Sequence, residues 1–459
     1  TGVLCVAMTA SGLFLGCAEA KETNITLSQQ QEEEVVALLG DLNENVSDGV
    51  KDELRKLVYE AETSITEREL KDNYRLSNEE AKVWEEITNL LDKETMRQFG
   101  RVYGYANGVS QGENQEENID YGKEMMDNLK KILSNQDWNR VNEIRNDYFT
   151  AIENNDQDYN TDPELEIRLI INKYSELDAD AILLNLLGDK SQKNLGMFKI
   201  TPEFDAVYQN GTENGLNLLG SEEQESLKKV WEQTTDILPK ELFANFKYFK
   251  VGGDGELGVF AYVTPLDSEG KIWCMSVDPA DIKDDGFYPY TVVHEMAHYI
   301  TLNQNQVKYL NSELYPMDRY REWLFVANED SYLQAYYKLF WRDMIIDWYT
   351  NRDNPYFYLR HQSQFVTGYA STNCTEDMAE SFSAYVLLDE APTPETQAKL
   401  DFFDSYPELK DIKSDILNNI KKNNVYVNPS NEPVYEQEEN STLLDGYISL
   451  LSSITEIMS

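Results

Sequence analysis

Residues 294–298 have the sequence His-Glu-Met-Ala-His, in which two histidines four positions apart flank a glutamate. The chain has only 3 histidines, so this pairing is uncommon as a chance event. Residues four apart lie on one face of a helix, where two imidazoles can bind one metal ion. The pattern H-E-x-x-H therefore predicts a Zn2+ site with His294 and His298 as ligands. Glu295 is the predicted general base, placed to accept a proton from a water molecule at the metal.

A zinc ion that activates water needs a third protein ligand and keeps a fourth position open. His361 is one candidate for this ligand. Glu376 is the candidate we favour, because Glu380 lies one helical turn further on. One carboxylate of the pair can bind the metal while the other accepts the second N–H of a ligand histidine.

The segment 368–380 (GYASTNCTEDMAE) resembles the third-ligand region of gluzincin metallopeptidases related to anthrax lethal factor and the secreted Pro-Pro endopeptidases. In that group a tyrosine precedes the ligand glutamate by seven residues, and an Ala-Glu pair closes the motif. Tyr369 precedes Glu376 by seven here (376 − 369), and Ala379 precedes Glu380. The resemblance implies that Glu376 binds zinc, that Glu380 supports a ligand, and that Tyr369 donates to the oxyanion.

The chain also departs from that group. His298 and Glu376 are 78 positions apart (376 − 298), a longer gap than in the short secreted members. We expect the aromatic-rich residues 308–349, mostly helical, to fill it. The resemblance does not extend over residues 1–215, so no substrate preference carries over.

Alternating or continuous apolar patterns predict strands at residues 246–250, 257–264 and 271–277, separated by Gly- and Asp-rich turns. Asp-Asp-Gly at 284–286 and Pro289 predict the start of the helix that carries His294. A second helix is expected over residues 376–388. The strand 257–264 has the small residues of a sheet edge, so an extended peptide could pair with it. Tyr262 in this strand and His361 are the candidate substrate-binding residues.

The fold class expected is α+β and mostly helical. After a tether at 17–26 we expect a helical N-terminal domain over residues 27–215, based on apolar spacings of three and four, for example at 123–133 and 164–171. A zincin-like catalytic domain with a small, mainly antiparallel sheet and the H-E-x-x-H helix is expected over 216–405. A C-terminal helical tail is expected over 406–459.

Residues 3–16 form a short apolar run that ends at Cys17 and is followed by charged residues. This pattern is typical of the apolar core of an export signal, here truncated, over residues 1–16. Phe-Leu-Gly-Cys at 14–17 resembles a bacterial lipobox, which predicts lipidation of Cys17. We therefore expect a lipid-anchored protein on the outer surface of a bacterium, Gram-positive by our prediction. A plain secretory signal is the alternative.

The 83 acidic and 40 basic residues give a formal net charge of −43. Such a surface repels nucleic acid and anionic lipid headgroups, so we expect no nucleic acid partner and a membrane association only through the lipid anchor. The expected partner is a peptide or protein substrate of a monomeric enzyme. Outside the cell, Cys274 and Cys374 could form a disulfide or remain two free thiols.

Together these residues predict an extracellular zinc peptidase, in our interpretation an endopeptidase. A non-catalytic surface lipoprotein that binds a protein partner is one alternative. A zinc hydrolase that acts on cell-wall material is another, because H-E-x-x-H specifies an activated water and not the bond that is cleaved.

Overall fold

The computed structural model describes residues 36–37, 40–67, 82–83, 86–87, 89–91, 95, 120–153, 162–188, 190, 192–215, 218–254, 259–283, 286–309, 319–322, 325–351, 356–388, 391, 393–428 and 454. The expected export signal, tether and Cys17 lie outside these residues. The chain divides into two compact units, which we describe separately. Within the described part of the chain, no helix has the length and apolar character needed to cross a lipid bilayer.

The first unit contains residues 117–340 and 374–434. Its helices are α5 (Gly122–Leu129), α6 (Asn135–Glu153), α7 (Pro163–Ile171), α8 (Ala179–Leu186), α9 (Gly211–Asn214), α10 (Ser221–Ile237), α11 (Tyr288–Leu302), α12 (Tyr332–Tyr336), α15 (Cys374–Leu387), α16 (Pro394–Asp404) and α17 (Pro407–Asn423), with short turns η2 (Lys240–Phe243) and η3 (Pro279–Asp281). Its strands are β1 (Lys193–Ile200), β2 (Ala206–Tyr208), β3 (Phe246–Gly253), β4 (Ala261–Pro265), β5 (Trp273–Val277), β6 (Val307–Tyr309), β7 (Arg321–Glu322) and β8 (Phe325–Ala327). A π-helical segment, η4 (Tyr337–Trp341), follows α12.

Five strands form one sheet in the order β2-β1-β3-β5-β4. The β1–β2, β1–β3 and β4–β5 pairs are antiparallel, whereas β3 and β5 run parallel. The described chain is therefore mostly helical with a small mixed sheet, as the α+β prediction required. The predicted strand 257–264 corresponds to β4, which lies at one edge of this sheet.

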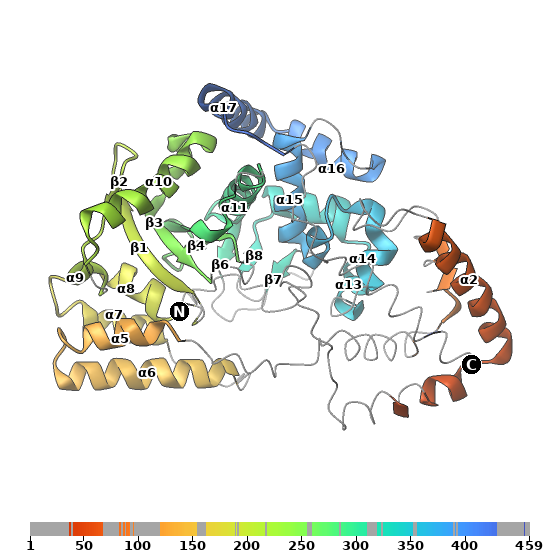
Figure 1. The fold of residues 1–459 in the computed structure, drawn as a ribbon, viewed down its shortest axis with the longest axis horizontal. Coiled ribbons are helices and arrows are strands. Elements are labelled where there is room, and N and C mark those ends of the chain that lie inside the picture. Colours follow the sequence, from red (N-terminus) through yellow and green to blue (C-terminus); the bar gives the residue numbers. More distant parts are fainter. Residues whose placement is uncertain are drawn as a thin grey trace. The chain divides into compact units, whose positions relative to one another are not determined.

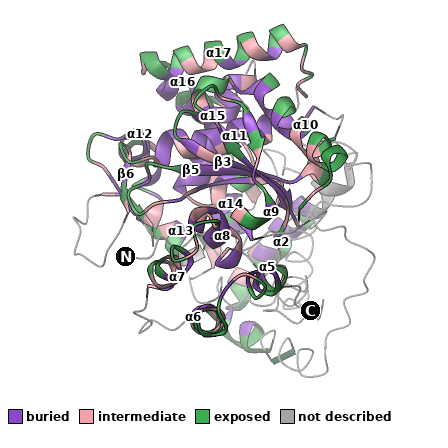
Figure 2. Cartoon of the chain, turned by 90° about the vertical axis from the view of Figure 1, so that its left-hand side faces the viewer, coloured by how far each residue is buried: buried purple, intermediate pink, exposed green. Residues whose placement is uncertain are grey.

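Helices cover both faces of the sheet (Figure 1). On one face, Ala181 and Leu184 of α8 pack against Met197, Tyr248 and Cys274. On the other face, Trp231 of α10 makes edge-on ring contacts with Phe243 and Phe249, and Trp273 contacts Tyr299 of α11 in the same way. The central strands β3 and β5 are consequently buried (Figure 2).

Helices α5 to α8 share an apolar core of their own, formed by residues such as Leu129, Val141, Ile167 and Ile182. Residues at the N-terminal ends of α7 and α8 explain where these helices begin. Asp162 caps α7 by accepting from Leu165 N, with Pro163 at the first helical position, and Asp178 caps α8. The predicted helices at 123–133 and 164–171 thus correspond to α5 and α7.

The second unit contains residues 12–116, 341–373 and 435–459. Its described elements are α2 (Asp48–Glu67), α13 (Ile345–Asn351), α14 (Tyr356–His361), η5 (Gln362–Gln364) and η6 (Tyr369–Thr372). Trp341, Trp348, Phe357 and Phe365 form an aromatic cluster within it.

Strands were missed in two segments that were expected to be helical. Residues 193–208, which we placed in the helical N-terminal domain, form β1 and β2 and belong to the same sheet as β3. Residues 308–349, expected to be mostly helical, do contain α12, η4 and most of α13, but they also contain β7, β8 and part of β6, which form a three-stranded antiparallel sheet that was not expected. These strands depend on pairing with distant strands, which local periodicity does not reveal.

Candidate metal centre

Helix α11 carries both predicted histidine ligands. It begins at Tyr288 with Pro289 in its first turn, as the sequence predicted. His294 and His298 are 8% and 4% exposed, and their rings meet edge to face with centroids 4.7 Å apart. The four-residue spacing therefore directs both imidazoles to one place inside the unit.

Helix α15 packs against α11 and brings Glu376, which is 5% exposed, to the same place. Glu376 Oε2 lies 3.1 Å from His294 Nε2 and 3.2 Å from His298 Nε2, and the two Nε2 atoms are 3.0 Å apart. Donors that bind a tetrahedral zinc ion at about 2.0–2.1 Å are roughly 3.3 Å from one another. The observed triangle is close to that size, and two imidazoles with one carboxylate are a donor set suited to zinc. Among the described residues, this is the one His/Cys/Asp/Glu group whose ligand atoms converge in this way.

Glu380, one turn after Glu376 on α15, lies behind the first histidine. Its Oε1 is 2.7 Å from His294 Nδ1. A carboxylate at this nitrogen keeps Nε2 turned toward the centre of the triangle and makes the imidazole more basic, and hence a stronger metal ligand. The helical spacing of Glu376 and Glu380 thus gives each a separate contact with His294.

Glu295 is tied to the edge strand of the sheet. The peptide N–H of Val263 in β4 donates to Glu295 Oε2 over 3.1 Å. Burial raises the pKa of Glu295, whereas the nearby histidines lower it. The carboxylate therefore sits next to both the histidine pair and the backbone of an edge strand.

Burial and mutual contact set the ionisation of the other groups in opposite directions. Burial alone would raise the pKa of Glu376, but His298 and His294 outweigh it and hold this pKa well below the usual range. Burial lowers the pKa of His294, but hydrogen bonds to Glu376 and Glu380 raise it well above its ordinary value. The cluster thus holds an ionised Glu376 carboxylate against the histidines, and a bound metal ion would take the place of the proton that these groups share.

The Tyr262 side chain does not lie on the α11 face of the sheet. Its hydroxyl accepts from Lys250 Nζ over 3.1 Å, and both side chains share the face of Tyr248 and Cys274. The next residue, Val263, is the one that contacts Glu295. A role for this strand in substrate binding would therefore depend on its backbone and not on the Tyr262 ring.

Tyr369 and His361 lie in the second unit. Tyr369 opens η6 and is 37% exposed, and its role as an oxyanion donor stays a prediction. His361 Nε2 is 2.9 Å from Asp347 Oδ2, and His361 Nδ1 is 3.1 Å from Gln364 Nε2. Both ring nitrogens are occupied, which fits a structural role, and substrate binding by His361 stays a prediction. Glu376 completes the group of side chains that could hold a metal ion, and His361 is not part of that group.

Cys274 and Cys374, the cysteines among the described residues, are separate, buried thiols. Cys274 lies in β5 and Cys374 begins α15. Of the two possibilities left open by the sequence, free thiols are the ones found.

Two features beside Glu376 were not anticipated. Glu322 of β7 accepts a hydrogen bond from Thr375 Oγ1 over 3.0 Å and another from the Tyr320 hydroxyl. On the other side, Asp377 Oδ2 lies 2.6 Å from Lys399 Nζ, and both residues are buried. No spacing in the sequence indicates either contact, because the partners are 53 and 22 positions apart.

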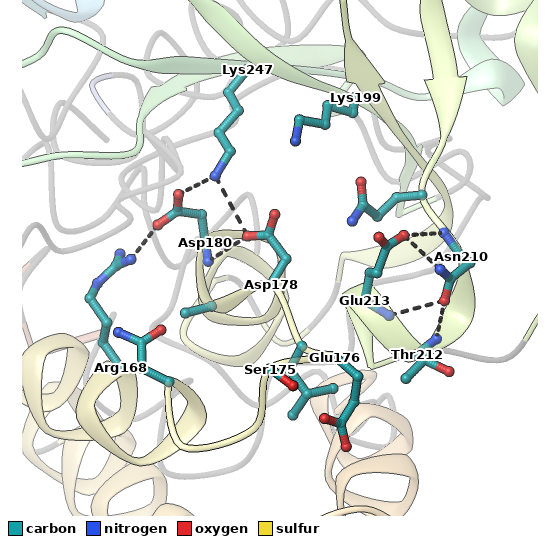
Figure 3. A pocket seen from close by; sticks show the side chains of 14 residues that line it. Arg168, Ser175, Glu176, Asp178, Asp180, Lys199, Asn210, Thr212, Glu213 and Lys247 are labelled. Carbon is teal, nitrogen blue, oxygen red and sulfur yellow. Dashed lines mark hydrogen bonds and ion pairs between the residues drawn. The ribbon is translucent and has the colours of Figure 1, made fainter.

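A separate polar pocket of about 600 Å³ lies between α8 and the sheet (Figure 3). Lys247 and Arg168 both pair with Asp180, and Lys247 Nζ lies 3.6 Å from Asp178 Oδ1. Burial raises the pKa of Asp180, but these two cations outweigh it and lower the pKa. The charges in this pocket largely neutralise one another and connect α8 to β3, so we assign the pocket no catalytic role.

Comparison with known proteins finds no relative of this chain. No family model, no curated protein and no solved structure matches it.

Proposed function

We propose that this protein is a zinc-dependent peptidase and, more specifically, an endopeptidase. The observation that carries the proposal is the triangle of His294 Nε2, His298 Nε2 and Glu376 Oε2, with sides of 3.0 to 3.2 Å. Glu295 lies beside it and contacts the edge strand of the sheet. In this proposal the three side chains of the triangle are the zinc ligands, Glu295 is the base, and the backbone of β4 binds the substrate.

Each residue has a role in this proposal. A zinc ion held by His294, His298 and Glu376 would polarise a water molecule and the carbonyl of the scissile peptide. Glu295 accepts the proton of that water and later donates it to the leaving amine. Its burial, which raises its pKa, suits a group that must both accept and release a proton. Glu380 keeps His294 oriented.

Substrate binding is proposed to use the open edge of β4. An extended peptide that pairs with a sheet edge gains main-chain hydrogen bonds. Because Val263 in the same strand contacts Glu295, a peptide at this edge would run past the base. Tyr369 is proposed to donate its hydroxyl to the carbonyl oxygen as negative charge develops there.

The same proposal includes a domain assignment and a membrane anchor. We propose a zincin-like catalytic domain that contains α11, α15 and the sheet, in an exported protein anchored through lipid on Cys17. Mass spectrometry of the N-terminal peptide from protein purified from membranes would test the anchor. An unmodified Cys17 thiol, or a mature chain without Cys17, would contradict it.

The deciding experiment combines metal analysis with cleavage of a peptide library by the purified residue 20–459 fragment. We expect about one zinc per chain, and cleavage products whose sites define the preference. Glu295→Ala should retain zinc and lose cleavage, whereas His294→Ala should lose both. Removal of zinc by a chelator should stop cleavage, and added zinc should restore it.

Zinc binding without cleavage of any peptide would contradict the peptidase and leave the alternative of a non-catalytic partner-binding lipoprotein. Zinc-dependent release of sugar or glycopeptide fragments from cell-wall material, with no peptide cleavage, would favour a cell-wall hydrolase. Absence of zinc from the wild-type protein would contradict all metal-dependent roles.

A further inference from the structure

A hydrogen bond ties the N-terminal end of α15 to the small β6-β8-β7 sheet. Thr375, the second residue of this helix, is fully buried and donates through Oγ1 to Glu322 Oε1 over 3.0 Å. Glu322 lies on β7 opposite Phe325 of β8. The contact therefore joins the insertion between α11 and α15 to the residue directly before Glu376.

Glu322 is a carboxylate in a costly position. It is half-buried, and in the described part of the chain no lysine or arginine forms an ion pair with it. Burial raises its pKa, the hydroxyls of Tyr320 and Thr375 lower it, and the charge of Glu376 raises it again. Keeping a carboxylate in such a place needs compensation, and both hydroxyl groups donate to the same oxygen, Oε1.

The residue after Glu376 is anchored as well. Asp377 is fully buried and forms an ion pair with Lys399 of α16, with 2.6 Å between Nζ and Oδ2. The Tyr336 hydroxyl donates to the same carboxylate over 3.0 Å. The backbone on both sides of Glu376 is thus held by side chains from other elements.

We propose that Glu322 is a positioning residue for the metal ligand Glu376, acting through the Thr375 hydroxyl. This inference rests on the proposed zinc site. By fixing the first turn of α15, the Glu322–Thr375 hydrogen bond keeps Glu376 Oε2 within reach of both histidine nitrogens. Residues that orient metal ligands in this way commonly change metal affinity by about 10- to 100-fold when they are replaced.

The test is zinc affinity of the full chain, measured by competition with a chromophoric chelator. Thr375→Val removes the hydroxyl with little change in shape and should weaken zinc binding by about 10-fold or more. Thr375→Ser keeps the hydroxyl and should restore it. Tyr320→Phe is the matched control, because it removes the other hydroxyl at Glu322 Oε1 without touching α15, and it should leave zinc affinity near that of the wild type.

Replacements of Glu322 separate hydrogen bonding from charge. Glu322→Gln retains an oxygen acceptor and should bind zinc nearly as well as the wild type, whereas Glu322→Leu should match Thr375→Val. The double variant Thr375→Val with Glu322→Leu should bind zinc no more weakly than either single variant, because both substitutions remove the same hydrogen bond. Circular dichroism of the metal-free proteins checks that each variant is folded.

Unchanged zinc affinity in folded Thr375→Val would overturn this inference and leave the zinc site standing. Equal losses in Glu322→Gln and Glu322→Leu would also overturn it, since the charge and not the hydrogen bond would then matter. If the wild-type chain binds no zinc, or if His294→Ala binds it equally well, the proposed function itself fails.

Discussion

The peptide N–H of Val263 donates to the carboxylate of Glu295, with 3.1 Å between Val263 N and Glu295 Oε2. The Val263 N–H therefore faces away from the sheet, and the hydrogen-bond register of β4 shows the same for its other odd-numbered residues. Asp278 N donates to Phe260 O, so the even-numbered residues of this strand pair with β5. Ala261 and Val263 therefore present their backbone groups at the open edge.

Proline substitutions at neighbouring positions of β4 should have different effects. Ala261→Pro removes an outward-facing N–H and is expected to lower kcat/KM for a peptide about three- to tenfold, the value of one backbone hydrogen bond. Tyr262→Pro removes an N–H that faces β5 and should lower the melting temperature, because proline within a ladder breaks a hydrogen bond of the sheet. Steady-state cleavage and thermal unfolding of both variants provide the measurements. Equal activity of Ala261→Pro and the wild type would remove this edge from substrate binding.

Glu380 should matter for zinc affinity more than for stability. Glu380→Gln weakens the contact with His294 Nδ1, so zinc should bind about 10- to 100-fold more weakly. Glu395→Gln, on the exposed surface of α16, is the charge-matched control and should leave affinity unchanged. Chelator competition measures both. Similar losses in the two variants would mean that net charge, and not the contact with His294, controls zinc binding.

Tyr369→Phe tests the role that the family resemblance implies. If the hydroxyl stabilises the oxyanion, its removal should lower kcat by about 100-fold and leave zinc content and KM nearly unchanged. Tyr349→Phe is a suitable control, since Tyr349 is another exposed tyrosine of the same unit. A loss of zinc from Tyr369→Phe, or an unchanged kcat, would contradict the oxyanion role.

Local spacing and a short motif were sufficient to predict that His294, His298 and Glu376 lie together. Both helices that carry them form at the predicted positions, and their role as zinc ligands stays a prediction. The edge position of the strand at 257–264 was also predicted. These features depend on neighbouring residues in the sequence, where amphipathic patterns and start signals are informative.

Long-range contacts could not be predicted in the same way. The strand β1 contains Gly196 and lacks a clear alternation, and its pairing with β3 is what makes it a strand. Glu322 faces Thr375 from 53 positions away, and the backbone contact between Val263 and Glu295 spans 32. Such pairs are set by packing of the folded chain, and one sequence carries no direct signal of them.

Because the two described cysteines are buried, we expect them to resist labelling by thiol reagents. Cys274 and Cys374 are fully buried, and burial raises the pKa of the Cys374 thiol well above its ordinary value, so little thiolate is present at neutral pH. In a variant with Cys5 and Cys17 replaced by serine, a thiol reagent should label neither residue in the native protein and both after denaturation. Rapid labelling of the native protein, or a mass two protons lower without reductant, would contradict this.

The ion pairs of Asp180 predict a pH-dependent contribution to stability. Its pKa in the folded protein is lowered by Lys247 and Arg168 against the opposing effect of burial. A group whose pKa falls on folding contributes stability above its unfolded pKa, about 3.9 for aspartate, and loses it as the pH falls through the folded value. Asp180→Asn should therefore lower the free energy of unfolding at pH 7 by about 1–3 kcal/mol.

The difference between the wild type and Asp180→Asn should stay constant from pH 7 to about pH 5 and diminish toward and below about pH 3.9, as the wild-type carboxyl becomes protonated. Asp205→Asn is the matched control, because Asp205 forms an ion pair with Lys228 that is more exposed, and such pairs contribute little. Urea unfolding at several pH values gives both free energies. A difference for Asp180→Asn that persists unchanged into strong acid would show that the two cations do not act through the charge of Asp180, since no ionised carboxylate would remain there to pair with Lys247 and Arg168.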